Sequence, residues 1–303
     1  MTVSRVQSTS SRAAIVVPFL LVSVVWGSTW LVIKDQISSV PPGWSITWRF
    51  LLASGVMVLM ARLRGDSLRL PAGGQKLAAL VGLMQFCVNY QFVYPSERYV
   101  TSGVVAVLYA LLMGPNALLS SAFLGTRMTG RFLVGSAVAL LGIGLLLLHE
   151  MRLAPPGSSV PLGVALAVAG ILAASVANVA QAAKAARISG PIPFMAWSMI
   201  WGTGLDAVWA WITVGPPVFD PHLRYFGGLA YLALFGSAFT FPLYFRLIRD
   251  MGAGKAAYTG VATPVIAMLL STLFEGYRWS VLAAAGSAIA IVGLLIALSS
   301  RRT

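Results

Sequence analysis

The sequence predicts an all-α integral membrane protein, with ten transmembrane helices arranged as two inverted five-helix repeats. Three observations predict this fold: a shortage of charge, an alternation of basic residues between successive loops, and similarity between the two halves of the chain. Of the 303 residues, 58% are hydrophobic and only 10% are charged, and the mean hydropathy is +0.85. Because soluble domains carry about 25% charged residues, we expect lipid to surround most of this chain.

Ten apolar stretches are long enough to cross a bilayer as a helix, which takes about 20 residues. They are residues 13–33, 42–62, 76–95, 100–124, 131–149, 161–183, 192–213, 226–247, 254–274 and 280–298. The connections between them are too short to hold a soluble domain. The first run continues to Ile33 without a small-residue cleavage site. That run is longer than a signal peptide's apolar region of about 7–15 residues, so we expect an uncleaved first helix.

The basic residues alternate between the two sides of the predicted membrane. The side that carries both termini holds most of the 21 lysines and arginines. The loops of the opposite side hold Lys34, Arg98, Arg152, Arg224 and Arg278. The positive-inside rule therefore predicts that both termini lie in the cytoplasm. The net charge of +13 then reflects membrane topology, and we expect no nucleic-acid partner.

The two halves of the chain resemble each other in order. The segment GSAVALLG at 135–142 returns as GSAIAIVG at 286–293, and Pro115 has a counterpart in Pro264. We therefore predict a first five-helix repeat at 1–152 and a second at 153–303. Since five is odd, the second repeat enters the membrane from the opposite face. Secondary transporters with this architecture bind substrate near the membrane midplane, between the repeats.

Few residues support catalysis or metal binding. Cys87 is the only cysteine, so an intrachain disulfide and a cysteine-based metal site are excluded, and we expect this residue to be buried. The two histidines, His149 and His222, fall in or beside predicted external loops. No common hydrolase, metalloprotease or phosphate-loop motif occurs. We expect no cofactor, no metal and no enzymatic activity, and a membrane-embedded transferase is the alternative.

Several motifs together resemble the drug/metabolite transporter superfamily, EamA branch. They are ten helices as five plus five, WGSTWLVIK at 26–34, WRF at 48–50, a proline within the fourth and the ninth helix, and Gly-rich fifth and tenth helices. The family's usual Glu after the ninth helix is Glu275, whereas Thr126 stands at the matching place after the fourth. Within the branch, the chain is similar to the bacterial inner-membrane exporters of aromatic and other neutral amino acids (YddG-like).

The resemblance implies a secondary transporter of the bacterial inner membrane. It would export amino acids such as Phe, Met and Thr by alternating access through a central cavity. Another small metabolite or drug, such as a nucleoside or a cationic compound, is the alternative substrate. The expected partners are the amino-acid substrate and the lipid bilayer, and we predict a monomer or a weak homodimer. Whether transport is coupled to protons is left open.

Polar and aromatic residues within the spans are the candidate substrate-binding residues, because polar groups in lipid must find partners or line a wet cavity. They are Trp26, Thr29, Trp30, Gln85, Asn89, Tyr90, Tyr109, Asn178, Gln181, Tyr244 and Tyr258. Rings would hold the substrate's side chain, while amides and hydroxyls would hold its ammonium and carboxylate groups. In the alternative interpretation, small and hydroxyl residues only pack helices together and the tryptophans form interfacial belts.

Arg49 and Asp206 are the two charges predicted to lie well inside spans, where a charge indicates function by default. They could pair with each other, although their helices are repeat mates that could lie apart. Arg49 could instead cap backbone carbonyls in a structural network. Asp206 could be a proton-coupling carboxylate, or a hydrogen-bonded or water-exposed residue.

Four residues are candidate hinges: Gly27, Pro115, Pro242 and Pro264. Gly27 would let another backbone approach or let its helix bend. The prolines interrupt the helical hydrogen-bond ladder and would bend in a gating motion, with static kinks as the alternative. We predict that the Gly-rich fifth and tenth helices are packing or dimer-forming elements.

Overall fold

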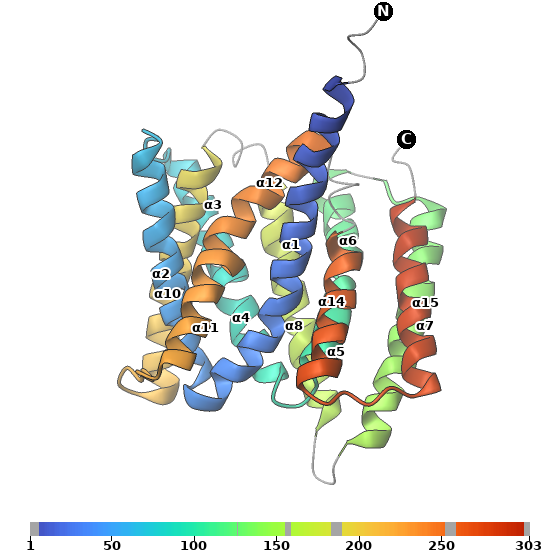
Figure 1. The fold of residues 1–303 in the computed structure, drawn as a ribbon. Coiled ribbons are helices and arrows are strands. Elements are labelled where there is room, and N and C mark those ends of the chain that lie inside the picture. Colours follow the sequence, from blue (N-terminus) through green and yellow to red (C-terminus); the bar gives the residue numbers. More distant parts are fainter. Residues whose placement is uncertain (1–5, 126, 155–158, 183–189, 252–258, 300–303) are drawn as a thin grey trace, which may run out of the picture.

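The computed structural model describes residues 6–125, 127–154, 159–182, 190–251 and 259–299. Within these residues every regular element is helical. The helices run roughly side by side, and α1 begins at the same end of the bundle at which α15 ends (Figure 1). The opposite end carries the α1–α2 turn and the connection 275–280 (Figure 1), and we call it the loop end.

The described ranges contain fifteen helical segments. In chain order they are α1 (Val6–Ser39), α2 (Pro42–Leu63), α3 (Ala72–Val81), η1 (Gly82–Val88), α4 (Asn89–Ser96), α5 (Ser102–Ala110), α6 (Met113–Leu124), α7 (Gly130–Leu153), α8 (Val160–Ala182), α10 (Pro191–Val214), α11 (Leu223–Ala233), η2 (Leu234–Phe239), α12 (Thr240–Met251), α14 (Thr259–Phe274) and α15 (Val281–Leu298). The segments η1 and η2 are π-helical and interrupt the third and the eighth predicted spans.

Among the residues that the structure describes, eight stretches of helix are long and apolar enough to cross a membrane. They are Val16–Ser39, Pro42–Leu63, Ala72–Ser96, Ser102–Leu124, Gly130–Leu153, Val160–Gln181, Leu223–Tyr244 and Val281–Leu298. These stretches confirm an all-α membrane protein. The seventh predicted span is the 24-residue helix α10, whose Asp206 and tryptophans lower its hydropathy. The described part of the ninth is α14, with 16 residues, so the number of ten spans stays a prediction.

The pairs of packed helices follow a symmetric scheme. Helix α7 packs along α15 and α2 along α10. Helix α1 contacts α11, η2, α12 and α14, while α8 contacts α3, η1, α4, α5 and α6. Exchanging the first five predicted spans for the last five maps these pairs onto one another. The scheme supports the repeats 1–152 and 153–303, which stay a prediction.

Glycines bring α7 and α15 into backbone contact. A Cβ atom added to Gly142 would lie 2.3 Å from the backbone nitrogen of Ala290, and one added to Gly293 would lie 2.2 Å from that of Ala139. Small residues commonly permit such close approach of helices in membranes. The Gly-rich fifth and tenth helices therefore pack on each other within one chain, which is the first of their two predicted roles.

The fourth predicted span is not one continuous helix, because it breaks next to Pro115. Helix α5 ends at Ala110 and α6 begins at Met113. A proline ring clashes with the carbonyl four residues earlier, which here belongs to Leu111, in the break. Pro242 likewise follows a distortion, since it comes three residues after the end of η2. Both prolines therefore accompany irregular helix, as expected of candidate hinges.

Gly27 and Pro264 lie within unbroken helices. Gly27 is inside α1, and a Cβ added there would lie 2.6 Å from the side chain of Ile266 in α14. Close approach of another helix, one of the two predicted roles of Gly27, is therefore present, whereas bending of α1 at this residue stays a prediction. Pro264 is inside α14, which is helical from Thr259 to Phe274.

Candidate functional site

The two tryptophans of α1 contact rings from both halves of the chain. The ring centroids of Trp30 and Tyr109 of α5 are 4.9 Å apart. Trp26 lies 5.0 Å from Tyr244 and 5.7 Å from Phe241, both in α12. All five side chains are half-buried. They form an aromatic surface that is suited to an apolar group of a ligand.

A line of polar contacts continues from these rings. The hydroxyl of Tyr109 donates a hydrogen bond to Oδ1 of Asn89 at 2.6 Å, and Nδ2 of Asn89 donates to the carbonyl of Gln85 at 3.2 Å. Gly170 of α8 lies against this pair, because a Cβ added there would be 2.5 Å from the Tyr109 hydroxyl. Three of the candidate binding residues, Gln85, Asn89 and Tyr109, therefore lie in contact, and their binding of substrate stays a prediction.

The indole N–H of Trp30 is a buried donor. In the described part of the chain, Nε1 of Trp30 has no hydrogen-bond partner. Nearly all buried polar groups in proteins are paired, so an unpaired one calls for an explanation. We call Trp30, Tyr109 and Asn89 the central cluster. It combines rings, a fixed amide and an unused donor, and these groups match a ligand that has both apolar and polar parts.

Most of the other predicted binding residues have partners outside the central cluster or no described partner. Nδ2 of Asn178 donates to Oδ1 of Asn116 at 3.4 Å and joins α8 to α6. Gln181 is half-buried near the end of α8. The hydroxyl of Thr29 donates to the carbonyl of Trp26 at 2.7 Å, so it is engaged within its own helix. Tyr258 lies outside the described residues.

Arg49 is held by hydroxyl groups, and it is only 2% exposed. Its guanidinium donates to the hydroxyl of Ser237 at 3.2 Å, to that of Tyr94 at 3.2 Å and to that of Tyr90 at 3.4 Å. It also lies 4.7 Å from the centre of the Tyr90 ring, in cation–π geometry. The described contacts involve no backbone carbonyl, so the predicted carbonyl cap is wrong. Arg49 instead joins α2 to α4 and η2.

Asp206 has a different partner. Nε2 of Gln91 donates to its carboxylate at 2.8 Å, and the thiol of Cys87 also lies within hydrogen-bonding reach. Cys87 is buried, as predicted. Helices α2 and α10 pack directly against each other, so the expectation that these repeat mates could lie apart is wrong. Even so, no ion pair between Arg49 and Asp206 occurs among the residues that the structure describes.

Sequence reasoning missed two buried or half-buried residues, Phe241 and Glu97. Phe241 lies 5.7 Å from Trp26 and 5.7 Å from Phe86, measured between ring centroids, and so extends the aromatic surface. No signal in an apolar span distinguishes such a phenylalanine from one that contacts lipid.

Glu97 is fully buried. Its position before Arg98 in a short polar loop would instead indicate an exposed charge.

Comparison with known families gives a match over most of the chain. The profile of the EamA-like transporter family matches residues 13–148 and 161–299. These two ranges lie on either side of the predicted boundary between residues 152 and 153.

Known proteins are similar over nearly their full length. Protein PagO from Salmonella typhimurium is 24% identical over 269 residues, which cover 89% of this chain and 88% of that protein. The uncharacterized inner membrane transporter YedA from Escherichia coli K12 is 31% identical over 256 residues, which cover 84% and 80%. A protein of known crystal structure superposes with a TM-score of 0.68 at 20% identity, covering 94% of this chain and 96% of that chain. That likeness shows the fold alone.

Proposed function

The chain belongs to the EamA-like transporter family, and from this membership we propose that it exports neutral amino acids, aromatic ones included. Phe, Met and Thr are the expected substrates, carried from the cytoplasm across the bacterial inner membrane. Family membership and the membrane-spanning helices make the protein a membrane transporter. The substrate class, the direction of transport and the cytoplasmic position of both termini belong to the proposal.

One observation carries the substrate class, namely the composition of the central cluster. The rings of Trp30 and Tyr109 suit an apolar side chain, whereas Asn89 and the unpaired indole N–H of Trp30 suit charged ammonium and carboxylate groups. The described ring contacts and hydrogen bonds of these residues include no carboxylate. Since no carboxylate directly contacts these residues in the described part of the chain, a zwitterion fits them better than a purely cationic ligand.

The positions of irregular helix support the proposal of alternating access. The third predicted span contains η1, the fourth breaks after α5, and the eighth contains η2. Such π-helical segments often mark functional sites, and here they flank the residues around Trp30. We propose that helix groups of the two repeats rock about the central cluster. Because the glycines of α7 and α15 are used within the chain, a monomer or a weak homodimer is the proposed assembly.

Counterflow of labelled Phe, Met and Thr in proteoliposomes tests this function. We expect saturable flux that depends on the protein and is inhibited by unlabelled Phe. Liposomes without protein and liposomes with the variant Trp211→Phe, altered at an exposed side chain, are the controls. If well-folded protein carries a nucleoside or a cationic compound and none of the three amino acids, the proposed substrate class is wrong.

A further inference from the structure

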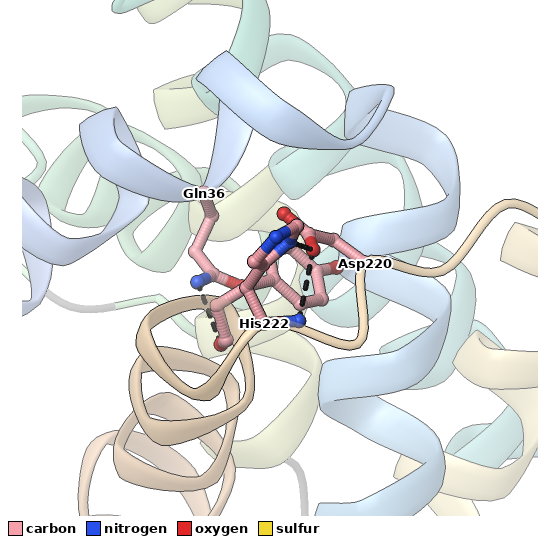
Figure 2. A network of polar contacts seen from close by, with 4 residues as sticks. Gln36, Asp220 and His222 are labelled. Carbon is pink, nitrogen blue, oxygen red and sulfur yellow. Dashed lines mark hydrogen bonds and ion pairs between the residues drawn. The ribbon is translucent and has the colours of Figure 1, made fainter.

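Two sets of polar contacts hold α1 at the loop end, and the first joins it to α11. Nε2 of Gln36 donates to the carbonyl of Tyr225 at 3.0 Å and ties α1 to α11 (Figure 2). Beside it, Asp220 accepts hydrogen bonds from the backbone and the ring of His222 (Figure 2). These bonds lower the pKa of Asp220 below its ordinary value. Asp220 therefore stays ionised and paired.

The second set joins α1 to the connection between α4 and α5. Lys34 lies on α1, because this helix continues to Ser39 beyond its predicted end. Its ammonium group donates to the carbonyl of Glu97 and, at 3.4 Å, to the carbonyl of Val100. Lys34 therefore fastens α1 to residues 97–100.

A neighbouring contact joins α5 to the end of α14. The hydroxyl of Ser102, the first residue of α5, donates to Oε2 of Glu275 at 2.6 Å. Glu275 follows the last residue of α14 and also accepts a hydrogen bond at 2.5 Å from Ser271 of that helix. Opening of the loop end between α5 and α14 would break the bond from Ser102 and leave the bond from Ser271 in place.

Glu97 lies among these contacts without a partner for its carboxyl group. Its side chain is 0% exposed, and neither carboxyl oxygen has a hydrogen-bond partner among the residues that the structure describes. Oε1 of Glu275 is also buried and unpaired in that part of the chain. Burying an ionised carboxylate without a partner is costly, so such a group takes up a proton or acquires a partner.

The ionisable groups that interact electrostatically with Glu97 come from four parts of the chain. They are Lys34 of α1, Arg49 of α2, Tyr109 of α5 and Glu275 after α14. His149 and Glu150 of α7 lie further out, where Glu150 interacts with Glu275, and α8 carries no ionisable side chain. Burial raises the pKa of Glu97 well above its ordinary value; Lys34 opposes this rise and Glu275 adds to it.

We propose that Glu97 and Glu275 share one proton-binding site that keeps the loop end closed and releases its proton when this end opens. At the loop end itself, Lys34 supplies one positive charge against two carboxyl groups, because Arg49 is held elsewhere by three hydroxyl groups. Ionisation of both carboxyls would therefore leave one negative charge buried there, and a single proton on either carboxyl oxygen removes it. Opening admits water, so the proton passes to the solvent on this face. The proposal rests on the alternating-access part of the proposed function, and it is independent of the substrate.

The direction of the pH effect follows from linkage between proton binding and conformation. The closed form binds the proton more tightly than the open form, so acid favours closure. This preference is lost as the pH rises through the pKa of the site in the closed form. One linked proton changes the ratio of open to closed protein by at most about tenfold per pH unit.

A cysteine at Met268 would report opening without any substrate. Met268 of α14 is buried against α5, since a Cβ added to Gly103 would lie 2.7 Å from its sulfur. The experiment uses the variant Met268→Cys with Cys87→Ala, in nanodiscs, reacted with a charged maleimide between about pH 5.5 and pH 8.5. The same cysteine combined with Glu97→Gln is the reference, because it corrects for ionisation of the thiol itself.

We expect the labelling rate, divided by that of the Glu97→Gln reference, to rise by tenfold or more across this range. Glu275→Gln should flatten the profile as Glu97→Gln does, and it carries the test if Glu97→Gln fails to fold. Asp206→Asn, which alters another buried carboxylate, should keep the full rise. An equal pH profile in the parent and in a folded glutamine variant would overturn the proposal. Because no amino acid is added, a failed transport assay leaves this result standing.

Discussion

The contacts of Arg49 and the central cluster are two groups of polar side chains inside the bundle. They differ in how completely their hydrogen bonds are satisfied. Arg49 is buried and donates to three hydroxyl groups. The central cluster is half open: its rings are half-buried and the indole N–H of Trp30 has no partner among the described residues. A satisfied group holds helices together, whereas an unsatisfied one has bonding capacity left for a ligand.

This difference separates residues that look alike in the sequence. Tyr90 and Tyr109 are both tyrosines within spans, and both were predicted to bind substrate. Tyr90 accepts a hydrogen bond from Arg49 and lies against its guanidinium, which supports a structural role. Tyr109 packs on Trp30 and fixes Asn89, which supports a role in binding.

The largest effect is expected from Arg49→Met. The change leaves the hydroxyls of Tyr90, Tyr94 and Ser237 without their donor, and each unsatisfied buried group costs about 1–3 kcal/mol. We therefore expect a loss of about 3 kcal/mol or more in stability, seen as a lower melting temperature and a lower yield of monodisperse protein. Arg62→Met, at an exposed position of α2, is the matched control. Equal melting temperatures of the two variants would contradict the structural role.

For Trp30→Phe in the central cluster we expect the opposite pattern, a loss of substrate affinity with little loss of stability. This change keeps a ring but removes the indole N–H, which has no described partner, so the melting temperature should hardly move. If the substrate uses that donor, its affinity should fall about fivefold, the equivalent of one hydrogen bond of about 1 kcal/mol. Trp211→Phe, at an exposed side chain, should leave the affinity unchanged. A lower melting temperature together with unchanged affinity would show that Trp30 has a structural role and does not bind substrate.

Tyr109→Phe should give an intermediate result that sharpens the comparison. It removes the hydrogen bond to Asn89 at 2.6 Å, at a cost of about 1 kcal/mol in stability. The amide of Asn89 is then free to turn, and we expect about a threefold loss of substrate affinity. Isothermal calorimetry and thermal melting of the same preparation measure both quantities. An affinity equal to that of the unaltered protein would remove Tyr109 from the site.

The smallest effect is expected from Asp206→Asn. The amide oxygen of asparagine can still accept the hydrogen bond from Gln91, which is 2.8 Å long in the present structure. We expect less than about a twofold change in flux, because a neutral hydrogen bond from Gln91 replaces a charge-assisted one. Flux with and without a pH gradient is the measurement. Loss of a response to the gradient would instead make Asp206 the coupling carboxylate.

The sequence was sufficient for features that depend on composition and spacing. The charge shortage and the apolar stretches predicted an all-α membrane protein, and helical spacing correctly placed Tyr90 and Tyr94 on one face, where both bind Arg49. The proline rule for helices also accounts for the break beside Pro115. These features are local, so they can be worked out from neighbouring residues.

Features that depend on contacts between distant helices could not be predicted. Gln91 and Asp206 are far apart in the sequence, and no pattern pairs them. Glu97 reads as a loop charge, and only the packing of α1, α5 and α14 around it reveals that it is buried. The π-helical form of η1 and η2 likewise has no signal in the residues themselves.

Binding of labelled Phe to the purified protein tests the central claim most directly, with the double variant Asn89→Leu and Tyr109→Phe in parallel. Replacing both partners of a hydrogen bond by apolar groups of similar shape is nearly neutral for stability, so the variant should stay folded. The account predicts saturable binding to the unaltered protein and at least about a tenfold weaker affinity in the variant. Equal affinity in both proteins, or no saturable binding to the unaltered protein, would contradict the account.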